Sequence, residues 1–156
     1  MPKVLIIYYS RTGNTERMAN IIADAIREKN VDVECKKVEN ANPKELLDVE
    51  GVVIGSPTYY GTMAAEIKKF IDDSVKYHGK LEGKVGAAFS SAAITGHETT
   101  VISILEALLI HGMIIQGDSS GQHYGATTVG KPDKNEVKWC QRFGQRVAKL
   151  VELIFS

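Results

Sequence analysis

Cysteine is scarce in this sequence, and no metal-binding pattern is present. It has two cysteines, Cys35 and Cys140, and four histidines among 156 residues. No histidine stands at a zinc-type spacing from either cysteine, so we expect no metal site. Cys35 falls in the alternating stretch VDVEC and Cys140 falls on a helical stripe. Both are therefore predicted to pack as small apolar side chains.

Long hydrophobic runs and an excess of one charge are also absent. No apolar run approaches the ~20 residues that a bilayer span requires. The start, MPKVLIIYYS, lacks the small-residue cleavage site of a signal peptide and is strand-like. Nineteen basic residues balance nineteen acidic ones, so no net field attracts nucleic acid. We expect a cytoplasmic single-domain protein over 1–156, without membrane or nucleic-acid partners.

Apolar strands and amphipathic helices alternate along the chain. The predicted strands are 3–9, 31–38, 50–55, 85–90 and 113–115. The predicted helices are 14–29, a short one opened by Pro43, 64–76, 98–110 and 134–154. This alternation predicts an α/β fold in which helices cover both faces of a five-stranded parallel sheet, doubly wound in the order 2-1-3-4-5. The long irregular piece 116–133 is of a length that is more often functional than idle.

Three polar stretches follow the ends of predicted strands. They read SRTGNT after the first strand, SPTYYGT after the third and SSAAITGHETT after the fourth. Ligands of doubly wound sheets bind beyond the carboxyl ends of the strands, where the strand order reverses. We therefore expect the three stretches to converge on one site.

The first stretch favours a phosphate group. It opens a helix, whose free N–H groups and positive dipole end attract an anion. Ser10, Thr12 and Thr15 add hydroxyl groups, and Gly13 allows the backbone to approach closely. One hydroxyl would suffice to cap the helix, so three hydroxyls with a glycine favour a phosphate cradle. Arg11 either contributes charge or points to solvent.

Several classes of phosphate site do not match. No GK[ST] motif exists, and no G-x-G-x-x-G opens a helix, so nucleotides and dinucleotides held in the usual ways are disfavoured. A receiver domain would need acidic residues at strand ends that read YYS and GSP. A cysteine phosphatase would need a thiol in the phosphate loop, which has none.

The second and third stretches favour a flat ring beside the phosphate. Tyr59 and Tyr60 place aromatic faces next to the cradle, where they can stack on a ring or simply pack at the rim. The third stretch is rich in hydroxyls and contains glycine, so its backbone can meet a ring edge that needs donors and acceptors. A monophosphate with a heteroaromatic ring fits all three stretches, and FMN is such a compound.

The motifs resemble a known family. VLIIYYSRTGNTERMA is similar to the flavodoxin phosphate loop, and the predicted strand order is flavodoxin-like. SPTYYG, FSSAAITGHETT, HGMII and YGATT resemble the quinone reductases of the tryptophan-repressor-binding-protein (WrbA) type. The resemblance implies non-covalent FMN, reduction by NADH or NADPH, delivery of two electrons to a quinone, and a homodimer or homotetramer.

The resemblance also assigns residues to the site. The phosphate loop would hold the phosphate, the second stretch would flank the ring, and the third would meet its polar edge. His111 would lie near the pyrimidine end, whereas without the resemblance it reads as a helix-end histidine satisfied by local carbonyls. The predicted cofactor-binding residues are Ser10, Arg11, Thr12, Gly13, Asn14, Thr15, Pro57, Thr58, Tyr59, Tyr60, Gly61, Ser91, Ala92, Ala93, Ile94, Thr95, Gly96 and His111.

Three departures from the family pattern bear on nicotinamide and quinone binding. The aromatic that many members carry in the phosphate loop is Thr12 here. Ala92, Ala93 and Ile94 replace part of the glycine-rich third loop. The insertion that carries a tryptophan near the substrate is missing. The sequence resembles a minimal member.

The leading hypothesis is an FMN-dependent NAD(P)H:quinone oxidoreductase with no obligatory acid or base residue. The alternative is a flavodoxin-type electron carrier, although such carriers are commonly acidic and cover the ring with aromatics from two loops. A third hypothesis is a flavin-sensing regulator. Helix 98–110 is apolar nearly all round, which predicts self-association.

Overall fold

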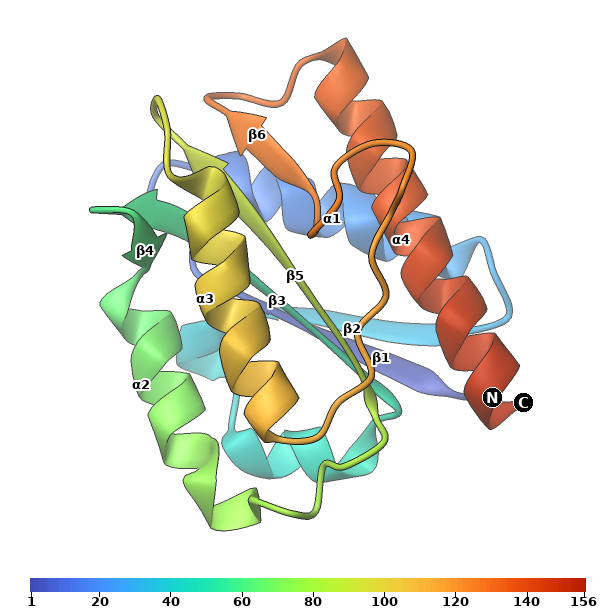
Figure 1. The fold of residues 1–156 in the computed structure, drawn as a ribbon. Helices are drawn as coiled ribbons and strands as arrows, with labels where there is room; N and C mark the ends of the chain where they lie inside the picture. Colours follow the sequence, from blue (N-terminus) through green and yellow to red (C-terminus); the bar gives the residue numbers. More distant parts are fainter.

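The computed structural model describes residues 1–156 as helices on both sides of one sheet (Figure 1). The strands are β1 (Lys3–Tyr8), β2 (Asp32–Lys37), β3 (Gly51–Tyr59), β4 (Thr62–Met63), β5 (Val85–Ala92) and β6 (Thr127–Val129). The α-helices are α1 (Asn14–Arg27), α2 (Ala65–Asp73), α3 (His97–Ile110) and α4 (Lys134–Phe155). Short 3₁₀ helices span Val38–Asn40, Pro43–Asp48 and Ser74–Tyr77. No helix combines the length and the apolar character needed to cross a bilayer.

The sheet has the predicted doubly wound topology. Its order is β2-β1-β3-β5-β6 with all neighbours parallel, and β4 pairs antiparallel with β3 outside this path. Counted over the parallel strands alone, this is the order 2-1-3-4-5, so the predicted fold class is confirmed.

Alternate side chains of the central strands build two cores, as the two-residue period of a strand requires. From β1, Val4 and Ile6 pack into the core under α1 and α4. Leu5 and Ile7 pack into the core under α2 and α3. Because both faces are covered, β1 reads as the continuous apolar run KVLIIY.

The fifth strand differs from its prediction. The segment 113–115 forms only an isolated bridge, Val85 with Ile114, supported by the Gly86 N–H donating to the Ile114 carbonyl at 2.9 Å. The ladder resumes at β6, inside the stretch that was predicted to be irregular. The strand is therefore interrupted by a loop over 115–126.

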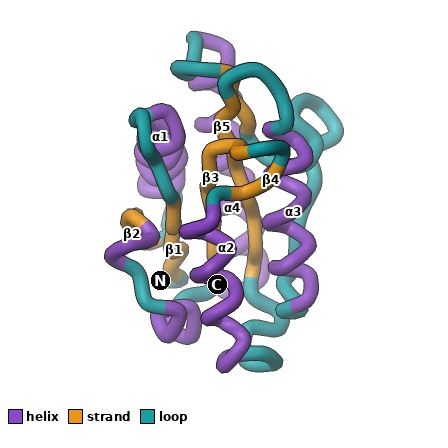
Figure 2. Tube along the Cα trace, turned by 90° about the vertical axis from the view of Figure 1, so that its left-hand side faces the viewer, coloured by secondary structure: helices purple, strands orange, loops and turns teal.

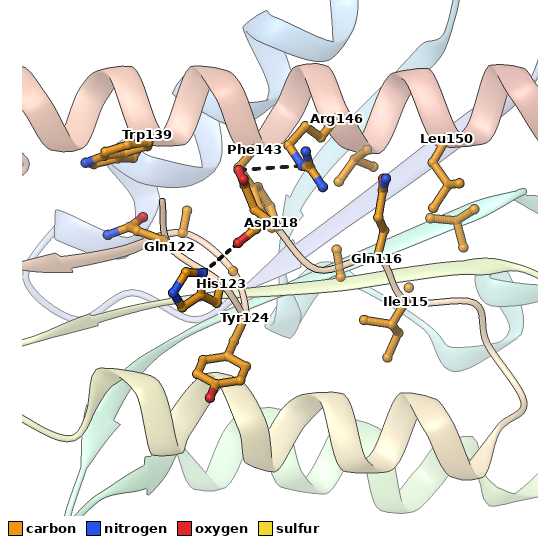
Figure 3. Close-up of a pocket in the computed structure, with 16 residues that line it drawn as sticks. Ile115, Gln116, Asp118, Gln122, His123, Tyr124, Trp139, Phe143, Arg146 and Leu150 are labelled. Atoms are coloured by element: carbon orange, nitrogen blue, oxygen red, sulfur yellow. Dashed lines mark hydrogen bonds and ion pairs between the residues drawn. The ribbon is translucent and has the colours of Figure 1, made fainter. Parts of the chain in front are cut away.

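The loop 115–126 is held to α4 by an ion pair and to β6 by hydrogen bonds. The Asp118 carboxylate accepts from Arg142 Nε at 2.6 Å and Nη2 at 3.0 Å, and the Arg142 guanidinium holds the pKa of Asp118 well below its usual range. Figure 3 shows Asp118 facing Arg146, which also donates to the Gly117 carbonyl. The Gln122 side chain donates to the Thr127 carbonyl at 2.8 Å and accepts from its N–H at 2.9 Å. Gln122 thus pairs with backbone groups at the outer edge of β6, which would otherwise be an unpaired strand edge.

Candidate functional site

The three polar stretches meet at one end of the sheet. Figure 2 shows the loop before α1, the turn between β3 and β4, and the loop after β5 at the same upper end of the molecule. The Thr15 and Ser91 hydroxyl oxygens lie 2.9 Å apart, which joins the first stretch to the third. The Thr58 and Ser90 hydroxyl oxygens lie 3.0 Å apart, which joins the second to the third.

The first stretch presents unpaired donors. Gly13 is the N-cap of α1 with φ 103°, and as a glycine it has no side chain to cap the helix. The Ser10 hydroxyl oxygen accepts from the N–H groups of Gly13 and Glu16, each at 3.2 Å, so its own proton is left to donate. The N–H groups of Thr12 and Asn14 have no partner. Donors that converge at a helix N-terminus make an anion site.

The other residues of this loop differ in exposure. Arg11 and Thr12 are exposed, and Asn14 is half-buried. Thr15 is only 1% exposed, and its hydroxyl is shared with the buried Ser91. Thr15 therefore serves packing between α1 and β5 in addition to any contact it makes with a ligand.

The second stretch forms a tight hairpin. Thr58 pairs with Met63 and Tyr59 with Thr62, which leaves Tyr60 and Gly61 as the two turn residues. Their φ angles are 50° and 80°, the left-handed values of a type I′ turn.

The two tyrosine rings of this stretch differ in exposure. The Tyr60 side chain is fully exposed at the hairpin tip. Tyr59 packs edge-on against Tyr9 with centroids 6.5 Å apart, and its buried hydroxyl has no partner. Pro57 is half-buried and lies opposite Ser91 in the β3–β5 ladder.

The third stretch begins inside the sheet. β5 runs two residues beyond its predicted end, so Ser91 and Ala92 are buried strand residues, and the Ala92 carbonyl accepts from the Gly130 N–H at 2.8 Å. In the loop between β5 and α3, Ala93, Ile94 and Thr95 are exposed and Gly96 is half-buried.

His111 is not brought to the three stretches. It follows the last turn of α3, whereas Gly96 precedes the first, and a helix of this length separates its ends by about 20 Å. Ser74 donates to the Ile71 carbonyl at 2.5 Å, so its oxygen accepts from His111 Nε2 at 2.8 Å. Burial and the nearby His78 ring lower the pKa of His111. Within this chain His111 therefore serves as a buried helix-end histidine.

Four polar residues of SSAAITGHETT make contacts here although they are not among the predicted cofactor-binding residues: Ser90, His97, Thr99 and Thr100. Thr100 donates to the Thr58 hydroxyl at 3.0 Å or to the Gly96 carbonyl at 2.8 Å, and Thr58 in turn meets Ser90. Thr99 donates to the Gly61 carbonyl at 2.7 Å. His97 has a buried Nδ1 without a partner. The threonines look like ordinary helix-start residues in the sequence, so nothing there marked these contacts.

A cavity under the loop 115–126 lies apart from this site. Figure 3 shows Trp139 of α4 beside Gln122 of the loop, with Phe143 of α4 and Tyr124 of the loop also lining the cavity. None of the predicted cofactor-binding residues lines it. Elsewhere, no cluster of three or more histidine, cysteine, aspartate or glutamate side chains could hold a metal ion.

The residues at the sheet end fit FMN. The unpaired N–H groups at α1 and the free Ser10 proton suit its phosphate. The exposed Tyr60 ring suits its flat ring system, and the Tyr59 hydroxyl and His97 Nδ1 are buried polar atoms without a partner in the protein.

Comparison with known proteins identifies the family. Residues 5–109 match the flavodoxin domain family. The chain is 34% identical to an NAD(P)H dehydrogenase (quinone) of Archaeoglobus fulgidus, over 97% of this chain and 98% of that one. It is 37% identical to a flavodoxin of Aquifex aeolicus, over 98% and 89% of the two chains.

Solved structures show the same fold. A flavodoxin from the domain Archaea superposes with a TM-score of 0.82 at 31% identity, covering 96% of this chain and 99% of that one. A WrbA-like flavodoxin of Agrobacterium tumefaciens gives a TM-score of 0.81 at 22% identity, covering 99% of each chain. The chain belongs to the flavodoxin family, and its cofactor is FMN.

Proposed function

We propose that this protein is an FMN-dependent oxidoreductase that reduces quinones by two electrons with NADH or NADPH. The observation that carries the proposal is the loop between β5 and α3: its exposed residues Ala93, Ile94 and Thr95 include no aromatic ring. One face of a ring bound beside Tyr60 would therefore stay open to a second flat molecule. Relatives named NAD(P)H dehydrogenase (quinone), such as that of Azorhizobium caulinodans at 33% identity over the whole of both chains, support the proposal.

The phosphate end of the site would fix the cofactor. Unpaired N–H groups of Thr12 and Asn14 and the Ser10 hydroxyl would donate to a dianion, which the N-terminal dipole of α1 also stabilises. These groups are already oriented in the protein, so binding loses little conformational freedom. Arg11 is exposed beside them and would add charge.

The ring end would leave space for the substrates. Tyr60 would supply an aromatic face on one side, and the Ala93–Thr95 segment would leave room for a nicotinamide or a quinone at the ~3 to 3.5 Å contact that transfer requires. The redox chemistry would be that of bound FMN: acceptance of a hydride from the nicotinamide, then two-electron reduction of the quinone with two protons, one of them from solvent. The protein supplies position and backbone donors, and no side chain of the three stretches is assigned as an acid or base.

A flavodoxin-type electron carrier is the second candidate. A relative named flavodoxin from Clostridium saccharobutylicum, 36% identical over 98% of this chain and 99% of that one, favours it. Against it stands the balance of nineteen basic and nineteen acidic residues, which removes the field that would steer a basic redox partner.

Turnover distinguishes the two candidates. The purified FMN-loaded protein is mixed with NADH or NADPH, with and without benzoquinone, and nicotinamide absorbance is followed. An oxidoreductase shows quinone-dependent oxidation with parallel double-reciprocal lines, because both substrates use the same face in turn. No oxidation of either nicotinamide, with FMN bound, would favour the carrier.

We also propose self-association through α3. Ile102, Leu109 and Ile110 are exposed on this helix, and Ile114 is exposed just beyond it. These four side chains form more apolar surface than an isolated helix face usually presents to water. A homodimer or homotetramer would cover it.

We also propose a cytoplasmic location, which the state of the two cysteines supports. Cys35 and Cys140 are both free, and Cys140 is fully buried. Free thiols suit a reducing compartment, which also supplies the nicotinamide cofactors. Fractionation of the native host with detection of the protein would test this location.

A further inference from the structure

The hairpin tip next to the ring site has a strained conformation. Tyr60 is the only residue other than glycine with a positive φ angle in the chain. A side chain in this region crowds the backbone, so the conformation persists only where surrounding contacts impose it. The exposed Tyr60 side chain cannot impose it. The contacts that impose it must therefore act on the hairpin backbone, through the β3–β4 pairing and through groups that bind the turn.

One such contact is a hydrogen bond from α3. The Thr99 hydroxyl lies 2.7 Å from the Gly61 carbonyl oxygen and 2.9 Å from the Gly96 carbonyl oxygen. The Gly96 oxygen already faces the Thr100 N–H at 3.0 Å and the Thr100 hydroxyl at 2.8 Å. Because Thr99 has one hydroxyl proton, the less occupied Gly61 oxygen is its better acceptor.

Other contacts fix the base of the hairpin, and at its tip Gly61 packs against Gly96, where a Cβ atom would lie 3.2 Å from the Gly61 Cα atom. Thr58 lies within hydrogen-bond distance of Thr100, and a side chain at Gly96 would come within 2.9 Å of the Thr58 methyl carbon. These contacts hold the hairpin base close to α3. Thr99 alone among the α3 side chains donates to a backbone group of the Tyr60–Gly61 turn.

We propose that Thr99 is a positioning residue for the flavin ring: its hydrogen bond to the Gly61 carbonyl sets the turn and thereby directs the Tyr60 ring. The proposal rests on FMN binding at this site. Thr99 itself need not touch the cofactor. Its effect should fall on ring binding and leave phosphate binding unchanged.

Two variants test this role in flavin titrations of the apoprotein. Thr99→Val keeps the shape of the side chain and removes the donor, whereas Thr99→Ser keeps the donor. Losing a hydrogen bond of ordinary strength predicts that Thr99→Val weakens FMN and riboflavin by the same factor, roughly three- to tenfold. Thr99→Ser should bind both flavins like the unaltered protein. Because the side chain is exposed, the apoprotein melting temperature should stay within about 4 °C.

A double-mutant cycle with Tyr60→Gly asks whether Thr99 acts through Tyr60. Glycine removes both the ring and the strain, so Thr99→Val should cause no further loss of flavin affinity in that background. Equal, additive losses in both backgrounds would overturn the proposal.

The controls separate this proposal from FMN binding itself. Unaltered binding of both flavins by Thr99→Val, or a loss confined to FMN, would overturn the role of Thr99 and leave the cofactor assignment standing. Failure of the unaltered protein to take up either flavin would overturn both.

Discussion

Replacing Thr12 by alanine should weaken FMN without weakening riboflavin. Thr12 is exposed in the first loop, and its hydroxyl has no partner in the protein. Only FMN carries the phosphate that this hydroxyl would meet. A hydrogen bond to a charged group contributes on the order of 1.5 to 3 kcal/mol. The dissociation constant of FMN should therefore rise roughly ten- to hundredfold, and that of riboflavin should stay unchanged.

Thr15→Val is the matched comparison, because the same kind of hydroxyl is buried there. Its removal leaves the Ser91 hydroxyl without its partner inside the protein, which costs about 1 to 3 kcal/mol of folding stability. Flavin fluorescence titration of the apoproteins gives the affinities, and urea unfolding gives the stabilities. Equal losses of FMN and riboflavin in Thr12→Ala, with stability unchanged, would refute the phosphate cradle.

Three further predictions concern other parts of the chain. Leu109→Glu on the exposed face of α3 should convert the proposed oligomer to monomers in light scattering, whereas a monomer mass for the unaltered FMN-loaded protein would refute self-association. Burial raises the pKa of Cys35 to about 11 and of Cys140 to about 12, so both thiols should resist disulfide reagents at pH 8 until urea unfolds the chain. Burial and His78 lower the pKa of His111, so its neutral ring contributes stability above the unfolded value of 6.5. That contribution is lost as the pH falls through the folded value, and His111→Gln should flatten the acid limb of the urea-unfolding profile.

Sequence reasoning located the elements whose signals are local. The run KVLII predicts a buried strand, and the helix after SRTGNT has a clear apolar face, so both ends of the phosphate loop were placed correctly. β6 was missed because TTV is short and polar. Its pairing depends on β5 and on Gln122, which covers its outer edge, and neither contact leaves a periodic signal.

The placement of His111 shows how an element can be predicted while its geometry is overlooked. The sequence predicts helix 98–110, which begins within the third stretch of the site. A helix of that length carries its far end about 20 Å away. The predicted helix therefore favours a helix-end role for His111, whereas only the resemblance to the family assigns it to the cofactor site.

The two ends of the proposed FMN site differ in how far apart in the sequence their residues lie. Its phosphate end is one continuous segment, in which Ser10 and the start of α1 lie within a few residues of each other. Its ring end joins Gly61 to Thr99, 38 residues apart, through a hydroxyl contact between a hairpin and a helix. Substitutions at the ring end can therefore alter how the ring is held while the phosphate loop retains the cofactor. One flavodoxin framework can in this way support either an open ring face for small substrates or a covered one for electron transfer between proteins.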